Sequence, residues 1–203
     1  MPRYSDLDAY VDAETGVLKN LLGVQDPHLL EKTEADLVSI RSLELAISPI
    51  SGIFDLAYLR KIHWHLFRDV YAWAGELRTV DISKGESRFA HHAYLESASQ
   101  PVFEQLKKEK HLTGLDMDAF RSRAAYYLGE LNALHPFREG NGRTAREFVQ
   151  QLARRSAYCF RWKGVSSAEM LRASIESFSG RSDRLTVVLR KVICPLPSQT
   201  LLA

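Results

Sequence analysis

Residues His135 to Arg146 read HPFREGNGRTAR and bring together side chains that could handle a phosphate group. The segment contains an imidazole, a carboxylate, two guanidiniums in its second half, and an asparagine between two glycines. Transfer of a phosphate-linked group to a hydroxyl needs a base, an anchor for a metal ion and donors for anionic oxygens. This one segment offers all three, so it predicts a site for phosphate chemistry.

The glycines and arginines of the segment are typical of an anion site at the start of a helix. Gly140 and Gly142 can adopt backbone angles closed to other residues and turn main-chain N–H groups inward. Asn141 is expected to cap a helix whose N-terminal amides attract anions. Arg143 and Arg146 share a face of its first turn, where they repel each other and the helix dipole. A bound phosphate would offset that repulsion.

His135 and Glu139 add acid–base and metal-binding chemistry. Imidazole titrates near neutral pH, so His135 could take the proton of an attacking hydroxyl. Glu139 is a hard oxygen ligand of the kind that Mg²⁺ uses beside nucleotide phosphates. Taken singly, they would be a helix-end histidine and a surface carboxylate. Their place beside the anion loop favours a general base and a metal ligand.

Two helices are expected to hold this segment at their junction. The first starts after Asp116 and ends at about His135, because Pro136 disfavours the α conformation at the residue before it. The second has an apolar face of the spacing that buried helices show. That face comprises Ala145, Phe148, Val149, Leu152 and Ala153.

The segment resembles the signature of the Fic family, HPFx(D/E)GNGRxxR, and fills every specified position. Residues 73–78 (WAGELR) resemble a second landmark of the family, and residues 80–89 (VDISKGESRF) resemble its flap. The resemblance extends from about Ala35 to about Val192. It implies an all-α helical bundle with a small β-hairpin flap over the active site.

By this resemblance, the chain would transfer AMP from ATP, with Mg²⁺, to a Tyr, Thr or Ser hydroxyl of a target protein. His135 would be the base and Glu139 the Mg²⁺ ligand. Asn141 and the amides of Gly140 and Gly142 would hold the α- and β-phosphates. Arg143 would pair with the β-phosphate and Arg146 with the γ-phosphate, and Asn132 is a guess for the base pocket. Gly142 favours nucleotidyl transfer, because kinase-like relatives carry lysine there.

The flap is expected to bind the target protein. Residues 77–83 alternate apolar and polar, as a strand does, and residues 87–90 could return as a second strand. The open edge of such a hairpin can pair with an extended segment of another protein. The candidate contact residues are Ser83, Lys84, Gly85, Arg88 and Phe89. Lys84 and Arg88 could equally be charges that keep the edge soluble.

Composition is compatible with one globular domain. The chain has 203 residues, 45% of them hydrophobic and 26% charged, with a net charge of +2. This small charge indicates neither nucleic-acid nor membrane binding. Two cysteines without disulfide density favour a reducing cytoplasm. We predict an N-terminal extension or lid at residues 1–34, a catalytic domain at 35–193 and a tail at 194–203.

We infer how this chain is regulated from an inhibitory sequence motif that it lacks. Many Fic proteins carry an inhibitory Ser/Thr-x-x-x-Glu helix whose glutamate pairs with the last arginine of the motif. No glutamate in this sequence has Ser or Thr four positions earlier. We therefore expect a separate small antitoxin to supply a glutamate to Arg146, as in toxin–antitoxin forms of the family. An effector domain cut from a longer protein is the alternative.

Other interpretations of these residues are weaker. Gly140-x-Gly142-x-x-Ala145 also matches a dinucleotide-binding pattern, but that pattern follows a strand, and a helix is expected here. Four histidines could indicate a metal site, yet no Cys or carboxylate completes a zinc set near them. They are His63, His65, His91 and His92. A module that only binds nucleotide, or one that transfers another nucleotide or phosphate group, stays open as an alternative function.

Overall fold

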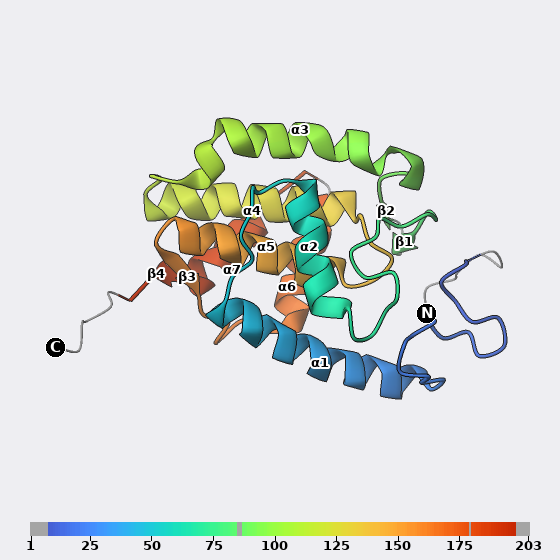
Figure 1. Cartoon of the computed structure of the whole chain (residues 1–203). Helices are drawn as coiled ribbons and strands as arrows, with labels where there is room; N and C mark the ends of the chain where they lie inside the picture. The colour runs from blue at the N-terminus through green and yellow to red at the C-terminus, as the bar shows by residue number, and fades with distance from the viewer. Residues whose placement is uncertain (1–7, 85–86, 179, 198–203) are drawn as a thin grey trace.

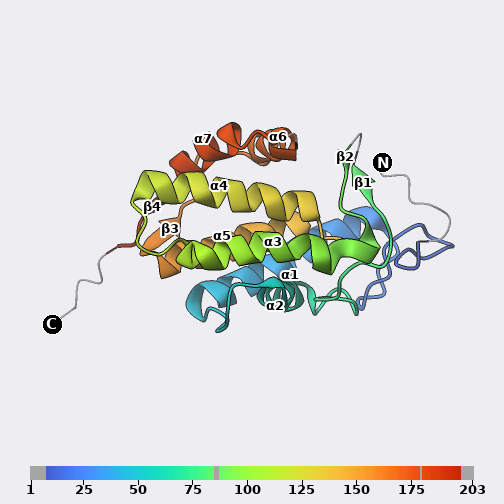
Figure 2. The same cartoon turned by 90° about the horizontal axis from the view of Figure 1, so that it is seen from above.

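The computed structural model describes residues 8–84, 87–178 and 180–197. In this part of the chain seven α-helices stack in layers (Figures 1 and 2). α4 lies between α7 and α5, α5 packs on α2, and α2 packs on α1, while α6 packs on α7. No helix among these residues is both long and apolar enough to cross a membrane. The predicted all-α bundle is confirmed.

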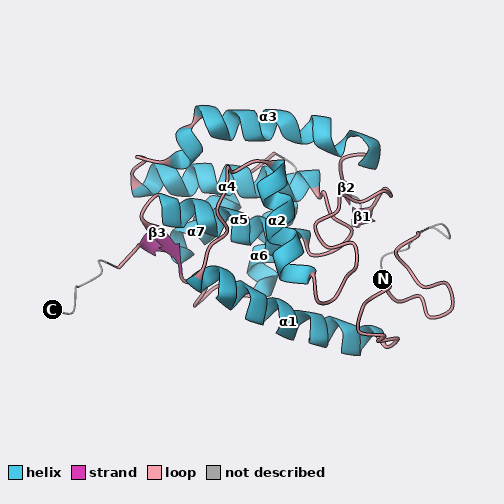
Figure 3. Ribbon diagram, viewed as in Figure 1, coloured by secondary structure: helices cyan, strands magenta, loops and turns pink. Residues whose placement is uncertain are grey.

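The elements follow one another in a simple order, and strands make up very little of the chain (Figure 3). Two short 3₁₀ helices, His92–Tyr94 and Lys110–Leu112, flank α3. The elements are α1 (Pro27–Ile47), α2 (Leu56–Phe67), β1 (Ser83–Lys84), β2 (Ser87–Arg88), α3 (Leu95–Lys108), α4 (Met117–Leu134), α5 (Asn141–Arg155), β3 (Tyr158–Phe160), α6 (Ser167–Phe178), α7 (Asp183–Val192) and β4 (Ile193–Pro195).

The two helices around the motif form as their sequences predict. The Asp116 side chain caps α4 by accepting the N–H of Ala119 at 2.9 Å. The apolar face of α5 is wholly buried in the core. The predicted cap of α5 is wrong, however, because Gly140 is the N-cap and Asn141 is the first helical residue. The Asn141 side chain turns back to the preceding loop instead of onto its own helix.

The flap is shorter than predicted. Of residues 77–83, only Ser83 lies in a strand, and β1 and β2 pair over two residues each, Ser83 with Arg88 and Lys84 with Ser87. The residues before β1 do not extend the strand because Arg78 bonds elsewhere. Its backbone N–H donates to the Pro136 carbonyl oxygen at 2.9 Å, which ties this segment to the motif loop.

Two of the predicted boundaries fall inside structural elements. The boundary between residues 34 and 35 divides α1, whose residue Leu30 is buried in the same core as α2 and α5. The predicted tail begins within β4, which pairs antiparallel with β3. This second strand pair was not predicted, because its two strands are more than thirty residues apart and each is only three residues long.

Candidate active site

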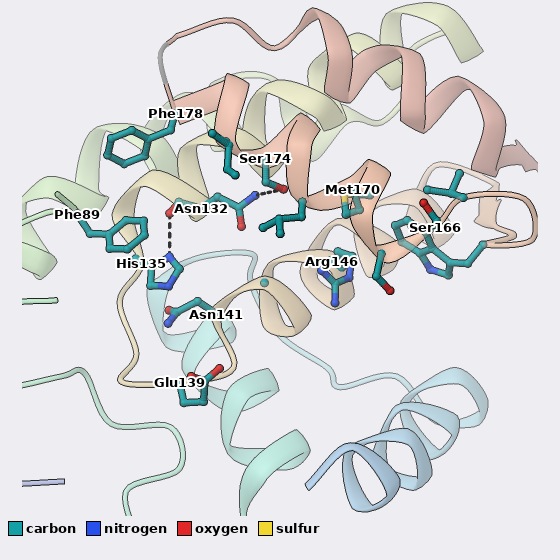
Figure 4. A pocket seen from close by; sticks show the side chains of 16 residues that line it. Phe89, Asn132, His135, Glu139, Asn141, Arg146, Ser166, Met170, Ser174 and Phe178 are labelled. Atoms are coloured by element: carbon teal, nitrogen blue, oxygen red, sulfur yellow. Dashed lines mark hydrogen bonds between the residues drawn. The ribbon is translucent and has the colours of Figure 1, made fainter. Parts of the chain in front are cut away.

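The last turn of α4 orients the His135 imidazole (Figure 4). His135 takes a left-handed conformation, with φ of 47° and ψ of 58°, and its N–H donates to the Leu131 carbonyl oxygen at 3.1 Å. Its Nδ1 lies 3.0 Å from the carbonyl oxygen of Asn132. A carbonyl oxygen only accepts hydrogen bonds, so Nδ1 carries the proton and Nε2 is the basic nitrogen. The ring therefore has the tautomer that a general base at Nε2 requires.

Phe89, just after β2, covers this imidazole. The two ring centroids are 3.8 Å apart and the planes differ by 14°, while the ring of Phe178 from α6 lies nearly perpendicular to that of Phe89, with the centroids 5.6 Å apart. We predicted Phe89 to contact a target. The structure places its ring against His135 and in the wall of the pocket.

The motif loop is closed by the buried side chain of Asn141. Its Oδ1 accepts the N–H of Phe137 at 2.8 Å, and its Nδ2 donates to the Phe137 carbonyl oxygen at 2.7 Å. Asn141 thus fixes the shape of the loop between His135 and α5. An amide with both a donor and an acceptor is needed for this pair of bonds, because one partner is the backbone N–H of Phe137 and the other is the carbonyl oxygen of the same residue.

Gly140 and Gly142 serve different purposes. Gly140 has φ of 78°, and a Cβ there would lie 2.2 Å from the Phe67 ring, so only glycine fits. Gly142 lies in the first turn of α5 with helical backbone angles, where the prediction of an unusual conformation is wrong. A Cβ on Gly142 would lie 3.3 Å from a guanidinium nitrogen of Arg146.

Arg146 reaches into the pocket from the first two turns of α5 (Figure 4). Burial lowers the pKa of its guanidinium, and the neighbouring charge of Arg143 lowers it further. Among the residues that the structure describes, no carboxylate lies within 4.0 Å of Arg146. A recessed cation without an internal counter-charge favours binding of an anion.

Arg143 points to a different place. It forms an ion pair with Glu34 of α1, lies 3.7 Å from Glu139 and rests over the Phe67 ring at 4.8 Å. Glu34 is buried and also accepts the hydroxyl of Tyr71, whose pKa is raised by burial and by the nearby carboxylate. Arg143 does not line the pocket. In the structure the two arginines do not face one common site, because α1 supplies Arg143 with a counter-charge.

Glu139 is the one carboxylate among the described residues that line the pocket. Its Oε1 accepts the N–H of Gly140 at 2.8 Å, which leaves its other oxygen for a further partner. A hard oxygen donor at the edge of an anion site suits Mg²⁺, which binds proteins through one or two carboxylates and takes its other ligands from phosphates and water. The donor chemistry therefore fits a magnesium–nucleotide complex.

The pocket has a volume of about 720 Å³, within the range of small-molecule sites. One end holds His135, Glu139 and Arg146. The opposite wall is apolar and comes largely from α6 and the loop before it, namely Trp162, Val165, Met170, Leu171, Ile175 and Phe178. The Asn132 side chain lies beside this wall, with its Nδ2 3.5 Å from Ser174 Oγ. A charged end and an apolar end together suit a molecule that joins phosphates to an aromatic base.

Arg78 connects the flap to the candidate base. Its side chain is fully buried and donates to three carbonyl oxygens, those of His135 at 2.9 Å, Val80 at 2.7 Å and Ala90. Val80 precedes β1 and Ala90 follows β2. One guanidinium thus holds both ends of the flap and the backbone of the residue that carries the imidazole.

Asp81 joins His91 and His92 at the base of the flap, so the prediction that no carboxylate lies near these histidines is wrong. Asp81 accepts the N–H of His92 at 2.8 Å, which is the main reason that its pKa is lowered, and lies 3.0 and 3.1 Å from the two imidazoles. His91 Nδ1 accepts the N–H of Ala93, so Nε2 carries the ring proton and donates to Asp81. A metal would need that nitrogen unprotonated. Hydrogen bonds therefore account for this cluster.

His63 links the segment after α2 to the motif loop from inside the core. Its Nδ1 accepts the N–H of Gly75 at 2.7 Å, and its Nε2 donates to the Glu139 carbonyl oxygen at 3.0 Å. Its ring stacks on Phe137, with centroids 3.8 Å apart. Burial lowers the pKa of His63 to about 3, so the ring is neutral. The interpretation of His63 as a packing residue rather than a metal ligand agrees with these contacts.

The flap residues predicted to meet a target have mixed positions. Ser83 is exposed in β1, and the backbones of Lys84 and Arg88 lie in β1 and β2. Gly85 lies outside the described residues. The pocket instead brings together seven of the predicted residues, namely Phe89, Asn132, His135, Glu139, Asn141, Gly142 and Arg146.

Comparison with known proteins decides the family. The profile of the Fic/DOC family matches residues 53–153, which include the whole motif. The Fic protein of Escherichia coli is 32% identical over 186 residues, covering 92% of each chain. The chain belongs to the Fic/DOC family.

Other relatives of this Fic/DOC domain come from Bartonella. The protein adenylyltransferase VbhT of Bartonella schoenbuchensis is 54% identical over 184 residues, which are 91% of this chain and 38% of VbhT. The chain thus spans well under half the length of that relative. The structure of BepC from Bartonella tribocorum with bound AMPPNP has a TM-score of 0.87 and 28% identity, and the match covers 92% of this chain and 96% of the other.

Two residues that shape the Fic/DOC site could not be identified from the sequence. Arg78 belongs to the landmark at 73–78, but nothing in that pattern shows that its guanidinium is buried against His135. Glu34 lies outside the range of the family match and 109 residues from its partner Arg143. Neither contact has a local signal, since each depends on how α1, α4 and α5 are arranged in the fold.

Proposed function

We propose that this chain transfers the AMP group of ATP to a hydroxyl of a target protein, on a Tyr, Thr or Ser side chain. The observation that carries this proposal is a pocket whose charged end holds the basic imidazole nitrogen of His135 together with the Arg146 guanidinium, which has no carboxylate within 4.0 Å among the described residues. VbhT and a Bartonella henselae relative that is 31% identical are named protein adenylyltransferases. Nucleotide is bound to the BepC structure.

In the proposed reaction, Nε2 of His135 accepts the proton of the target hydroxyl while that oxygen attacks the α-phosphorus of ATP. The bond between the α-phosphorus and the bridging oxygen breaks, and pyrophosphate leaves. The hydrogen bond from Nδ1 to the Asn132 carbonyl oxygen stabilises the imidazolium that forms. Arg146 and the N-terminal amides of α5 balance the charge on the phosphates. We assign no phosphate to Arg143, because Glu34 occupies it.

Glu139 is the residue that would hold Mg²⁺. When bound, the cation would neutralise negative charge on the phosphates of ATP and on the pyrophosphate that leaves. Glu139 Oε1 keeps its bond to the Gly140 N–H, so the carboxylate is already oriented toward the start of α5.

The direct test is incubation with Mg²⁺ and ATP labelled at the α-phosphorus, with a bacterial lysate as the source of targets. We expect label on protein with the wild type and none with His135→Ala. Label from the γ-phosphorus instead would show a kinase. Binding of ATP by both proteins without transfer by either would show the competing function, a module that only binds nucleotide. Repeating the assay with CTP, GTP and UTP identifies the base.

We propose that the target docks along the edge of the flap as an added strand. The hairpin has two pairing residues on each strand, so it is too small to be stable alone and can gain from a third strand. Its end at Phe89 touches His135, so a segment paired there would bring its hydroxyl to the base. Mass spectrometry of the labelled lysate identifies the modified residue.

We further propose that a separate small protein silences the enzyme by placing a glutamate against Arg146, and that the pair is a toxin and its antitoxin. Support comes from the missing Ser/Thr-x-x-x-Glu pattern and from the absence, among the described residues, of a carboxylate near Arg146. Expression in bacteria should then stop growth, whereas the His135→Ala variant should not. Growth at the normal rate with active, soluble wild type would contradict the toxin role.

We place the reaction in the cytoplasm, where ATP and Mg²⁺ are available, and the catalytic domain at residues 35–193. Because α1 is one helix across residue 34, a variant that starts at Asp26 keeps the whole of α1 and its N-cap. That variant lacks Asp8, which forms an ion pair with Arg138, so labelling equal to that of the longer chain would show that this pair is not required for transfer.

A further inference from the structure

The two cysteines of the chain face each other across β3 and β4. In the antiparallel register, Cys159 is directly opposite Cys194, and their Sγ atoms lie 3.0 Å apart. Both residues are partly exposed, so a small thiol reagent can reach them. They are 35 positions apart in the sequence, and the number of cysteines alone does not predict that these two lie side by side.

The backbone geometry at this pair suits a disulfide. The N–H of Leu196 donates to the Ala157 carbonyl oxygen at 2.8 Å, and that of Arg161 donates to the Val192 carbonyl oxygen at 2.7 Å. The cysteines lie midway between these two bonded pairs, which makes them a hydrogen-bonded site of the ladder. Cα atoms at such sites are about 5.5 Å apart, which is close to the commonest spacing in disulfides. No large backbone movement is needed.

We propose that Cys159 and Cys194 form a reversible intramolecular disulfide by exchange with a low-molecular-mass disulfide such as oxidised glutathione. One thiolate attacks the glutathione disulfide, which forms a mixed disulfide and releases one glutathione thiolate. The second cysteine thiolate then attacks the protein sulfur of that mixed disulfide and releases the second glutathione. Two protein thiols are oxidised and one glutathione disulfide is reduced to two glutathione thiols, which take up the two protons that the protein thiols give up.

Thiol–disulfide exchange at these cysteines should be slow at neutral pH. Burial and the neighbouring Cys194 raise the pKa of the Cys159 thiol, which keeps it protonated. The side chain of Arg161 acts in the opposite direction but to a smaller extent. Exchange should therefore be faster above neutral pH.

A disulfide between these cysteines would crosslink the part of the fold that forms the apolar pocket wall. α6 and α7 lie between the two cysteines in the sequence, and α6 contributes Met170, Ser174 and Phe178 to the pocket. β4 joins this unit to the strand after α5 through a short strand pair, and α6 and α7 also pack on α4. The crosslink restricts the unfolded chain, so it stabilises the native state. This inference does not depend on the proposed function.

The test uses the purified chain, incubated with oxidised glutathione at pH 8.5 or with dithiothreitol, then denatured and alkylated with iodoacetamide. We expect the oxidised protein to be lighter by two hydrogen atoms, to resist alkylation and to yield a peptide pair that links Cys159 to Cys194. Its thermal midpoint should exceed that of the reduced protein by about 5–10 °C.

Cys159→Ser and Cys194→Ser provide matched controls, because serine keeps nearly the same volume. Each should carry a single glutathione adduct and lose the thermal shift. Wild type that carries two glutathione adducts, or that keeps two alkylatable thiols, overturns the proposal. A disulfide-linked protein whose thermal midpoint is no higher than that of the reduced protein would show that the bond does not stabilise the fold.

Discussion

At the scale of single residues, Gly140 and Gly142 look alike in the motif but meet different constraints. Gly140 has positive φ and lies against the Phe67 ring, so its lack of a side chain is required by the fold. Gly142 has ordinary helical angles, and the nearest atom to a Cβ there belongs to Arg146. The absence of a side chain at Gly140 allows the Phe67 ring to pack there, and the absence of a side chain at Gly142 leaves room for the Arg146 guanidinium in the pocket.

Gly140→Ala should lower the free energy of unfolding by about 2–4 kcal/mol, from backbone strain and overpacking together. Gly142→Ala should change it by less than about 1 kcal/mol, because alanine favours helix. It should instead weaken ATP binding, since its methyl group displaces the Arg146 guanidinium. Urea unfolding and calorimetric titration with ATP measure the two effects. Equal losses of stability would contradict this distinction.

His63 shows how a buried imidazole makes stability depend on pH. Its pKa falls from an ordinary 6.5 to about 3, so between these values the unfolded chain binds a proton that the folded chain does not. Stability from this site is therefore complete above pH 6.5 and is lost as the pH falls.

The wild type should lose about 2 kcal/mol of unfolding free energy through His63 between pH 7 and pH 5. His63→Asn should remove that part of the pH dependence, although it lowers stability at both values. Urea unfolding at the two pH values gives the difference. His28→Asn, on an exposed position of α1, is the control and should keep the wild-type dependence. An unchanged dependence in His63→Asn would show that the ring is accessible to protons.

At the scale of elements, Arg78 joins the flap, the motif loop and the end of α4. Its buried guanidinium satisfies three carbonyl oxygens from separate segments. Lysine is a single point donor and cannot reproduce this fork. The position of His135 relative to the flap thus depends on a residue that does not line the pocket.

Arg78→Lys should lower unfolding free energy by about 2–4 kcal/mol, because carbonyl oxygens lose their donors. The rate of AMP transfer should fall at least about tenfold, since small displacements of catalytic groups are costly. ATP affinity should change little. Arg190→Lys, at an exposed position of α7, is the control and should affect none of the three. A loss of ATP affinity equal to the loss of rate would contradict a positioning role.

The contact between α1 and α5 rests on Glu34 and Arg143. Glu34 is buried, accepts the Tyr71 hydroxyl and supplies the charge that holds Arg143 away from the pocket. α1 is therefore part of the scaffold of the site and more than a cover.

Glu34→Gln keeps the shape but removes the charge, and it should lower the unfolding free energy by about 1–3 kcal/mol. Glu31→Gln, one turn earlier on the exposed side of α1, should change it by less than about 0.5 kcal/mol. Thermal and urea unfolding of both variants measure this contrast. Equal effects would mean that the ion pair contributes nothing beyond a surface charge.

At the scale of the whole molecule, the fold separates two neighbouring arginines of the motif and leaves one of them in the pocket. Arg143 has Glu34, but Arg146 has no carboxylate within 4.0 Å among the described residues. A bound anion therefore stabilises the folded state in addition to serving the reaction.

With Mg²⁺ and ATP at a hundredfold excess over the dissociation constant, unfolding free energy should rise by about 2.7 kcal/mol. That corresponds to a thermal midpoint about 5–10 °C higher. Arg146→Ala should lose most of this shift at the same ATP concentration, whereas Arg172→Ala, exposed on α6, should keep it. An equal shift in Arg146→Ala would place the phosphates elsewhere.

The helical architecture, the junction of α4 and α5, and the family could all be predicted from the amino-acid sequence. These features are local: periodic apolar positions, Asp116, Pro136 and the twelve residues of the motif act on their near neighbours. Seven of the predicted site residues line one pocket because they lie in or near that junction and in the flap beside it.

Which of the distant side chains meet depends on how the helices pack in the folded chain. It separated Arg143 from Arg146, buried Arg78 against His135, and brought Asp81 to His91 and Cys159 to Cys194. Each of these contacts joins segments whose distance in the sequence says nothing about their distance in space. Their partners are chosen by how helices pack and where a buried charge finds a counter-charge, and these are properties of the whole fold.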